Sequence, residues 1–337
     1  MSIRLKDISD ATSFSVNTVS RALRGDPRIS EATREAIVRK AEELGYIPNA
    51  IAGIMRTNRS RTIGVVSADS SNPFFAEVIL GIEEAARKLD HSILLINTEE
   101  KAENEREAIK LLLGRQVDGL VVFPVYDDPA NLALYRSLEI PFLFAGRRVR
   151  GIEDHSILHG DVEGQIEVVD HLLDKGHRKI LYIAGPENVS NTVDRLEGFR
   201  EAYRRRGLEP DPDLLLSSSG HIEDSYAKLN LALNRGREFS AVVCFNDLVA
   251  IGALKSLFEN DRSVPREVEV FGFDNLAISQ FLRPSLSSVD VPKSRLGRLA
   301  VEELVAHIED PEREYRTLRI KPRLVFRETT SDANPQS

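Results

Sequence analysis

The feature that most constrains the fold is a regular alternation, from residue 62 onward, of short apolar runs and amphipathic segments. The apolar runs are continuous, which indicates strands buried on both faces and therefore parallel sheets. The alternation passes through two cycles, which predicts two doubly wound α/β lobes. We predict strands at 62–67, 92–97, 119–123, 141–145, 179–184, 241–245 and 269–273. We predict helices at 74–89, 104–115, 165–175, 194–206, 224–233, 248–259 and 294–308.

The last part of the chain indicates that the two lobes exchange segments. The predicted helix at 294–308 and short strands near Leu318 and Val325 come after both cycles are complete. These late elements are expected to return to both lobes.

The charge of the chain is divided unevenly between its first 61 residues and the remainder. The whole chain has 45 basic and 53 acidic residues, a net charge of −8 that by itself argues against nucleic-acid binding. The first 61 residues hold 11 Lys and Arg against 7 Asp and Glu, and the remainder holds 34 against 46. A segment of +4 joined to a body of −12 indicates a separate nucleic-acid-binding module.

The sequence also argues against membrane and secreted proteins. No run approaches the roughly 20 apolar residues that span a bilayer, and the N-terminus lacks the apolar region of a secretory signal. We therefore expect a cytoplasmic protein. The single cysteine, Cys244, lies in an apolar run and is expected to be a buried, unreactive thiol.

Three helices are predicted before residue 46. They cover residues 6–12, residues 16–23 and the segment between Ser30 and Gly45. Ser15 and Ser30 are suited to cap the second and third helices, and Gly45 to end the third. Two short helices joined by a tight turn are typical of a helix-turn-helix. The alternative is a three-helix cap whose Ser and Arg side chains are merely solvated, and the spacing alone does not decide between the two.

In a helix-turn-helix, the second helix reads the DNA. It enters the major groove N-terminus first, so Val16 and Asn17 are expected nearest the bases. Asn17 can pair with adenine, Arg21 can reach guanine or phosphate, and a valine methyl can pack on a thymine methyl. Phosphate contacts fix the register of the protein on DNA without reading its sequence. The hydroxyl groups suited to such contacts are those of Ser15, Thr18 and Ser20.

Four motifs of this N-terminal segment carry a family resemblance. They are Leu5-Lys-Asp-Ile-Ser, Ser15-x-x-Thr18-Val-Ser-Arg-Ala-Leu23, Thr33-Arg-Glu and Ala41-x-x-Leu-Gly-Tyr-Ile-Pro-Asn49. They resemble the head of lactose-repressor (LacI/GalR) family regulators. This resemblance implies an operator-binding helix-turn-helix and extends the DNA-binding set to Lys6, Tyr46, Asn49 and Ala52. The family's usual Ala-Gly-Val turn is here Thr12-Ser-Phe14, so a left-handed Ser13 is expected at a small cost in stability.

A short segment at 50–57 follows, with Gly53 and Met55 inside it. Eight residues with an internal glycine do not hold a helix in water unaided, so one interpretation is a flexible linker. In the family that the head resembles, the matching segment is a hinge that becomes helical on the operator. The resemblance implies that Met55 takes the place of the family's leucine wedge between the central base pairs.

Polar loops follow the strands of both predicted lobes. In open parallel sheets, ligands bind beyond the carboxyl ends of the strands. Asn72 and Phe74 follow the first strand, and the second lobe places similar loops at Arg195, Asn246 and Asp274. Asn and Asp after strands often only cap the next helix. Several converging loops favour a cleft, because such side chains bind hydroxyls and an aromatic ring packs on a sugar.

Motifs of the body extend the same resemblance. They are Asn72-Pro-Phe-Phe75, Val117-Asp-Gly119, Gly176-His-Arg178, Arg195-x-x-Gly198-Phe199, Asn246-Asp247 and Gly272-Phe-Asp274. They are similar to the two-lobed, periplasmic-binding-protein-like core of the LacI/GalR family. The resemblance implies a homodimeric transcriptional regulator that binds near-palindromic double-stranded operator DNA and, between its lobes, a small effector, commonly a sugar or its phosphate. The implied effector-binding residues are Asn72, Phe74, Arg147, Arg195, Asn246 and Asp274.

The sequence departs from the family pattern around this cleft. The usual Asp-Arg after the fourth strand is Gly146-Arg147, and the usual Asp-Asn before the next helix is Asp161-Val162. The position that supplies a carboxylate-binding Arg in purine repressors is Val189, which weighs against a purine corepressor. A basic pocket, suited to an acidic or phosphorylated sugar, is an open alternative that would use Arg147, Arg195 and His221.

No phosphate-loop, zincin or hydrolase-elbow motif occurs, so we expect no catalytic residue, cofactor or metal. His155, His159 and Asp161 have the spacing of metal ligands, but that spacing requires a helix and the segment reads as extended. The rival to a ligand-gated repressor is a sugar-binding or sugar-processing protein with an accessory head.

These patterns predict four parts of the chain. They are a helix-turn-helix domain at 1–47, a hinge and linker at 48–61, a two-lobed effector-binding and dimerisation domain at 62–330, and a disordered tail at 331–337.

Overall fold

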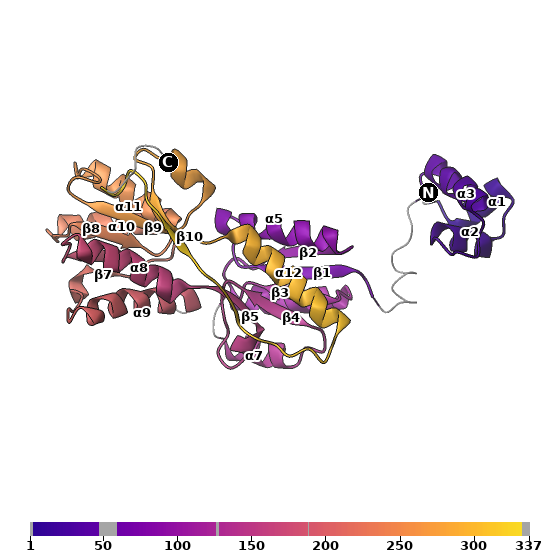
Figure 1. Cartoon of the computed structure of the whole chain (residues 1–337), viewed down its shortest axis with the longest axis horizontal. Helices are drawn as coiled ribbons and strands as arrows, with labels where there is room; N and C mark the ends of the chain where they lie inside the picture. The colour runs from indigo at the N-terminus through magenta and orange to yellow at the C-terminus, as the bar shows by residue number, and fades with distance from the viewer. Residues whose placement is uncertain (1–2, 47–58, 126–127, 188, 332–337) are drawn as a thin grey trace. The chain divides into compact units, whose positions relative to one another are not determined.

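The computed structural model describes residues 3–46, 59–125, 128–187 and 189–331. It divides into two compact units, Met1–Ser60 and Arg61–Ser337, which are called here the head and the body (Figure 1). Three residues predicted to contact DNA, Asn49, Ala52 and Met55, lie outside the described residues.

The head contains α1 (Leu5–Thr12), α2 (Val16–Leu23) and α3 (Glu31–Leu44). Each helix turns apolar residues at helical spacing toward one small core. Its buried members are Ile8, Val19, Ala22, Ile37 and Ala41. The three helices predicted from the sequence are therefore confirmed.

The ends of these helices also match the sequence prediction. Ser15 Oγ accepts the N–H of Thr18 at 3.1 Å, and Ser30 Oγ accepts the N–H of Thr33 at 3.4 Å. Gly45 ends α3 with a φ of 69°. Each serine satisfies a backbone donor that the first helical turn leaves free.

The body contains two sheets, each with six strands in the described residues (Figure 1). The first runs β11 (Leu318–Ile320), β5 (Ser156–His159), β4 (Phe142–Ala145), β3 (Gly119–Val122), β1 (Thr62–Ser67) and β2 (Ser92–Asn97). The second runs β12 (Arg323–Val325), β10 (Ser287–Asp290), β9 (Glu269–Asp274), β8 (Ala241–Cys244), β6 (Ile180–Ile183) and β7 (Leu215–Leu216). The pairings are parallel apart from the antiparallel pair of β10 with β12.

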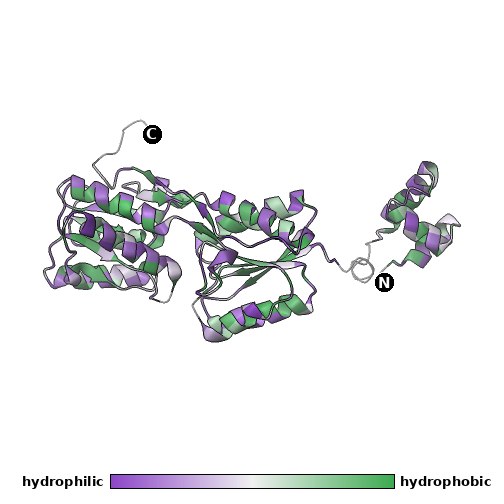
Figure 2. Ribbon diagram, turned by 60° about the horizontal axis from the view of Figure 1, so that its bottom comes forward, coloured by the Kyte–Doolittle hydropathy of each residue, from purple (hydrophilic) through white to green (hydrophobic). Residues whose placement is uncertain are grey.

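Helices cover both faces of each sheet. In the first lobe, α5 (Pro73–Lys88) and α12 (Lys293–Glu309) pack on one face, and α6 (Ala102–Gly114) and α7 (Pro129–Arg136) on the other. In the second lobe the corresponding pairs are α8 (Asp161–Asp174) with α9 (Ser190–Arg205), and α10 (Ile222–Asn234) with α11 (Asp247–Glu259). Figure 2 shows the apolar strands enclosed between helices with polar outer faces.

Successive side chains of β1 explain the continuous apolar runs. Val65 joins the core beneath α5, and Val66 joins the core beneath α6. A strand between two helical layers must be apolar on both faces, so the predicted pair of doubly wound lobes is confirmed. Cys244 is likewise fully buried in β8, and burial raises the pKa of its thiol.

The predicted exchange of segments is confirmed by the two late strands. β11 joins the first sheet through β5, and β12 joins the second through β10. α12 packs closely on α5, where a Cβ on Gly297 would lie 2.2 Å from the carbonyl oxygen of Val78. Ser331, assigned to a disordered tail, instead donates its hydroxyl to Glu269 at 2.6 Å.

Several element boundaries differ from the prediction. α8 begins at Asp161 rather than 165, and α9 at Ser190 rather than 194, because their first turns are polar and lack the apolar spacing used to locate them. α7, β7 and β10 were not predicted, and β5 was expected only as an extended segment. β10 has one apolar residue, Val289, and is recognisable as a strand only through its neighbours β9 and β12. No helix in the described part of the chain is long and apolar enough for a bilayer span.

The turn between α1 and α2 gives a test of backbone strain. Ser13 has a φ of 60°, in the left-handed region that favours glycine. We expect Ser13→Gly to raise the stability of the head by about 0.5–1 kcal/mol, because strain is removed and partly offset by the extra entropy of the unfolded chain. Hydrogen exchange of the α1 and α2 amides measures this change. Ser20→Gly, inside α2, is the matched control and should lower stability; a loss with Ser13→Gly as well would contradict the argument.

Candidate functional site

The exposed surface of α2 carries the predicted base-contacting residues. Val16 and Asn17 are exposed, and Arg21 is half-buried near the end of the helix. An exposed valine at a helix start has no core to fill, which is consistent with contact to a base methyl group. The head therefore places side chains able to read bases on its surface.

The hydroxyls of α2 are already engaged within the head. Ser15 and Thr18 hydroxyls lie 2.8 Å apart, and Ser20 accepts from Arg24 at 2.6 Å. Each hydroxyl still has further hydrogen-bonding capacity for a phosphate. Of the other predicted contacts, Lys6 is exposed and Tyr46 packs partly against the core of the head.

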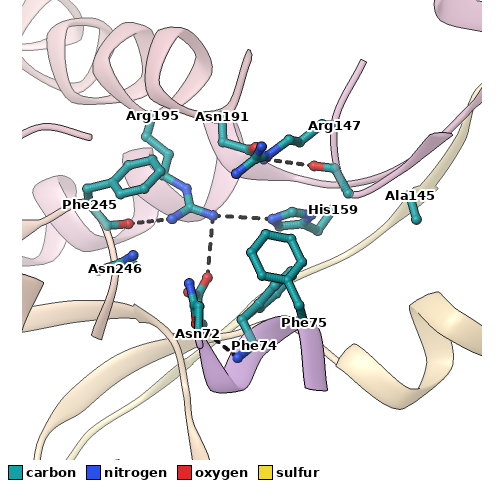
Figure 3. Close-up of a pocket in the computed structure, with 12 residues that line it drawn as sticks. Asn72, Phe74, Phe75, Ala145, Arg147, His159, Asn191, Arg195, Phe245 and Asn246 are labelled. Atoms are coloured by element: carbon teal, nitrogen blue, oxygen red, sulfur yellow. Dashed lines mark hydrogen bonds and ion pairs between the residues drawn. The ribbon is translucent and has the colours of Figure 1, made fainter. Parts of the chain in front are cut away.

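The six predicted effector-binding residues all line one pocket between the lobes (Figure 3). It lies at the carboxyl ends of β1, β4, β5, β8 and β9, where an open parallel sheet binds ligands. Its cavity encloses only about 40 Å³. The predicted members are Asn72, Phe74, Arg147, Arg195, Asn246 and Asp274, and the others are Phe75, Ala145, Gly146, His159, Asn191 and Phe245.

Arg195 of α9 is the central charged residue of the pocket and is 3% exposed. Its Nε donates to Asp161 Oδ1 at 2.6 Å, and its Nη1 donates to the carbonyl of Phe245. Its Nη2 lies 3.2 Å from His159 Nε2 and 3.5 Å from Asp274 Oδ1 (Figure 3). The guanidinium charge is therefore compensated inside the protein.

Two aromatic rings enclose the same guanidinium. Its carbon lies 3.6 Å from the ring centroid of Phe273 and 4.7 Å from that of Phe245. A cation between ring faces is stabilised by their quadrupoles, more so when it is desolvated. Arg195 thus fills the apolar slot in which the ring of a ligand could lie.

Sequence reasoning missed Asn191 as a residue of the pocket, where its side chain bonds to Asp161, which is not part of the lining. Asp161 Oδ2 accepts from Asn191 at 2.9 Å, and Asn191 also donates to the carbonyl of Gly146 at 2.8 Å. His159 was considered only as a metal ligand. A signal did exist, since His159 ends β5 and Asp161 opens α8, both at the carboxyl edge of the first sheet. No group of three or more metal-ligating side chains occurs among the described residues.

Two predicted effector residues act as helix caps. Asn72 Oδ1 accepts the N–H of Phe74 at 3.0 Å and starts α5. Asn246 Oδ1 accepts the N–H of Val249 at 2.8 Å, and its Nδ2 donates to the carbonyl of Gly220 at 3.2 Å. Capping uses both ends of the Asn246 amide, whereas Asn72 keeps its NH2 group for a ligand.

The contacts of the two arginines weigh against the alternative of a basic pocket. Arg147 donates to both carboxylate oxygens of Glu100, at 3.2 and 3.0 Å, and to the carbonyl of Pro124 at 3.1 Å. Arg195 is paired with Asp161, and His221 is an exposed residue before α10 that does not line the pocket. The carboxylates that partner both arginines leave little net positive charge for an anion.

Hydrogen bonds join the lobes outside the pocket lining. Arg148, which follows β4, pairs with Asp194 of α9 and donates its N–H to Ser190 Oγ at 3.2 Å. On another side, Glu77 of α5 accepts the N–H of Ala277 at 3.3 Å. These contacts hold the lobes close together, in keeping with the small cavity.

Family models match both units of the chain. "Bacterial regulatory proteins, lacI family" matches residues 4–49, and "Periplasmic binding proteins and sugar binding domain of LacI family" matches residues 60–329. The chain belongs to the LacI family. It is a DNA-binding transcriptional regulator with the family's sugar-binding type of body, as the sequence motifs predicted.

Relatives of this LacI-family protein match along almost its whole length. The ribose operon repressor of Haemophilus influenzae is 29% identical over 325 residues, covering 96% of this chain and 98% of its own. The HTH-type transcriptional repressor PurR of Vibrio parahaemolyticus is 30% identical over 331 residues, covering 98% and 99%. A lac repressor dimer bound to operator and the anti-inducer ONPF has a TM-score of 0.89 at 25% identity, covering 98% and 99%. A complex of the regulator CelR with cellobiose has a TM-score of 0.75 at 27% identity, covering 97% and 99%.

Burial governs protonation in this LacI-family pocket. It raises the pKa of Asp274 to about 7, although Arg195 and Lys293 act in the opposite direction. It lowers the pKa of His159 to about 4, so that the ring is neutral at pH 7. Burial also raises the pKa of Asp247, the first residue of α11, to about 6.

The raised pKa of Asp274 predicts a pH-dependent stability. Between about pH 4 and 7 the folded protein holds a proton on Asp274 that the unfolded chain has released. Stability therefore falls as pH rises through this range, by up to about 1.4 kcal/mol per pH unit. Asp274→Asn has no carboxyl group at this position, so its free energy of unfolding should not show this fall. The difference between the free energies of unfolding of Asp274→Asn and the wild type should therefore shift in favour of the variant as the pH rises toward 7.

Denaturant unfolding at pH 4.5, 5.5, 6.5 and 7.5 measures the difference. The matched control is Asp261→Asn, at an exposed turn of the same lobe with a φ of 54° that asparagine accepts. Parallel pH profiles for wild type and Asp274→Asn would contradict the assigned pKa.

Proposed function

We propose that this regulator represses transcription by binding a near-palindromic operator as a homodimer, and that a neutral sugar bound between its lobes controls that binding. The observation that supports a neutral ligand is the internal pairing of the pocket's cations. Arg195 lies against Asp161, and Arg147 against Glu100. A phosphorylated sugar would have to displace one of these carboxylates, whereas hydroxyls can add to the existing network.

The lining of the pocket is suited to a sugar ring. Phe74, Phe75 and Phe245 supply apolar faces, and the NH2 group of Asn72 and the carboxyl group of Asp274 supply polar partners. Val189 is apolar and 1% exposed, so it offers no cation for a purine corepressor. This favours a carbohydrate over a purine, although relatives named PurR are among the matches.

The small cavity supports a mechanism of control. Pockets for drug-sized ligands enclose roughly 300–1,000 Å³, against about 40 Å³ here. A sugar therefore needs the lobes to part or Arg195 to move. Because a ligand that prefers one arrangement of the lobes shifts their equilibrium, it also shifts any DNA affinity linked to that arrangement. We propose binding rather than catalysis as the role of this pocket.

Exposed apolar side chains support the homodimer. Leu94 and Leu95 are 41% and 46% exposed on β2, the edge strand of the first sheet. In the second lobe, Phe258 and Phe281 are 47% and 73% exposed beside a groove formed by α11 and the segment after residue 281. Exposed apolar side chains of this size are frequent at protein interfaces.

The proposal also covers the contacts of the head with DNA, the division of the chain and its location. The head reads the operator through the α2 residues, Met55 wedges into the minor groove, and Lys6, Tyr46, Asn49 and Ala52 add contacts. We propose the four-part division at 1–47, 48–61, 62–330 and 331–337, with Ser331 belonging to the folded body. The proposed location is the cytoplasm, where a bacterial operator lies.

A ligand panel tests the nature of the effector. We expect one or more neutral sugars to raise the unfolding temperature of the body and to change operator affinity at the same concentration. The corresponding sugar phosphates should have a smaller effect, because the pocket's arginines are already paired. Thermal shift and fluorescence anisotropy with a selected operator measure the two effects. A phosphate that stabilises more than its parent sugar would contradict the neutral-ligand proposal.

A pair of head variants tests the role of α2. Asn17→Ala should cost about 1–3 kcal/mol at one operator base pair and relax the preference there, because a paired side chain is lost. Lys6→Ala should weaken binding to all DNA sequences about equally. It should also lower the magnitude of the slope of log affinity against log salt concentration by about one. Titrations over a set of single-base operator variants, at several salt concentrations, separate the two effects. A uniform loss from Asn17→Ala would show that it contacts only the backbone.

A further inference from the structure

His159 ends β5 with its ring inside the pocket between the lobes. The residue is 2% exposed, and its ring centroid lies 6.0 Å from that of Phe74 and 6.4 Å from that of Phe273. Aromatic groups of the first and second lobes therefore flank it. A hydrogen bond made by this ring is shielded from water and is therefore strong. Whether each ring nitrogen donates or accepts then decides which ligand atom can lie beside it.

The contact with Arg195 favours a proton on Nδ1 of the ring, although Asp161 Oδ1 also lies 3.5 Å from Nε2. Arg195 Nη2 lies 3.2 Å from His159 Nε2. A guanidinium donates hydrogen bonds and cannot accept them, so Nε2 accepts here and the proton of the neutral ring lies on Nδ1. Burial, reinforced by the charges of Arg195, Arg147 and Lys293, lowers the pKa of His159 to about 4, which keeps the ring neutral at pH 7.

The Nδ1–H donor of His159 has no hydrogen-bond partner among the described residues, although the atom is buried. A buried donor without a partner costs about 1–3 kcal/mol. Most such groups in native proteins are satisfied by protein or ordered water. We therefore expect an acceptor atom, from water or from a ligand, to receive a hydrogen bond from this donor.

Gly146 lies next to this donor, and the position where its Cβ would stand faces the ring of His159. A Cβ on Gly146 would lie 3.8 Å from His159 Nδ1 and 3.5 Å from Cε1, and both residues line the pocket. Gly146 has a φ of 71°, which disfavours any larger residue. The sequence pattern noted above places an aspartate here in related regulators, so this chain has a glycine where a carboxylate would otherwise face the histidine. The acceptor must then come from the ligand.

We propose that His159 is a specificity-determining residue that selects an effector with a hydrogen-bond acceptor oxygen beside Gly146. The acceptor is a hydroxyl, ring or carbonyl oxygen of the sugar, and it receives the Nδ1–H of His159. The inference rests on the proposed binding of a neutral sugar.

Two substitutions separate the two nitrogens of the ring. His159→Gln keeps an oxygen near Nε2 that can accept from Arg195, but it removes the Nδ1–H donor. His159→Asn keeps an NH2 group near the Nδ1 position, but it removes the acceptor for Arg195. His177→Gln is the control, because His177 is a partly buried histidine outside the pocket, bonded to Ser240 at 2.8 Å.

The test measures dissociation constants by calorimetry for D-ribose, D-glucose, D-galactose and cellobiose and for the monodeoxy derivatives of each sugar that binds. In the wild type, one deoxy derivative should bind about tenfold or more weakly than its parent. His159→Gln should weaken the parent by a similar factor and abolish that difference. His159→Asn and His177→Gln should keep the difference.

The outcomes distinguish the inference from the function on which it rests. A sugar that binds with equal affinity to wild type and His159→Gln overturns the role of His159 and leaves the sugar-binding function intact. Failure of every sugar to bind overturns the proposed function, and the inference with it. Nitrogen-15 NMR of the wild type gives a test without ligand, because a His159 ring protonated on Nε2 instead of Nδ1 would also overturn the inference.

Discussion

The pairing of Arg195 with Asp161 is the interaction on which the pocket depends. Both side chains are 3% exposed and lie 2.6 Å apart. Removing one partner of a buried ion pair costs about 3–5 kcal/mol, since it leaves a charge without compensation. The pair also joins α9 to α8 and brings His159, Asp274 and the carbonyl of Phe245 to the same guanidinium. The contacts of one side chain thus organise the carboxyl ends of strands from both sheets.

This arrangement explains why the pocket is both polar and closed. The guanidinium of Arg195 lies against the rings of Phe245 and Phe273, so the protein's own cation occupies their faces. The same closure is held outside the pocket by Arg148 with Asp194. The energy that binds a ligand must therefore compete with contacts within the protein. In the proposed mechanism, a ligand bound here shifts the equilibrium between arrangements of the lobes.

The fold could be predicted in most of its elements because it depends on local patterns. Continuous apolar runs marked the buried strands, and Ser15, Ser30 and Gly45 marked helix ends. β10 escaped prediction, since its four residues contain one apolar side chain and its burial comes from neighbouring strands. The six residues predicted to bind the effector line one pocket because the strand ends of parallel sheets meet at one edge.

The sequence by itself determined the two-lobed α/β body, the three-helix head and the types of side chain at the strand ends. These follow from periodicity, capping and motifs, which act over a few residues. Only the tertiary structure decided the state of those side chains. Both arginines are paired with carboxylates, Asn246 caps a helix, and the buried Nδ1 of His159 beside Gly146 has no hydrogen-bond partner among the described residues. Such pairings join residues far apart in the chain, and their distances and burial have no signature in local sequence.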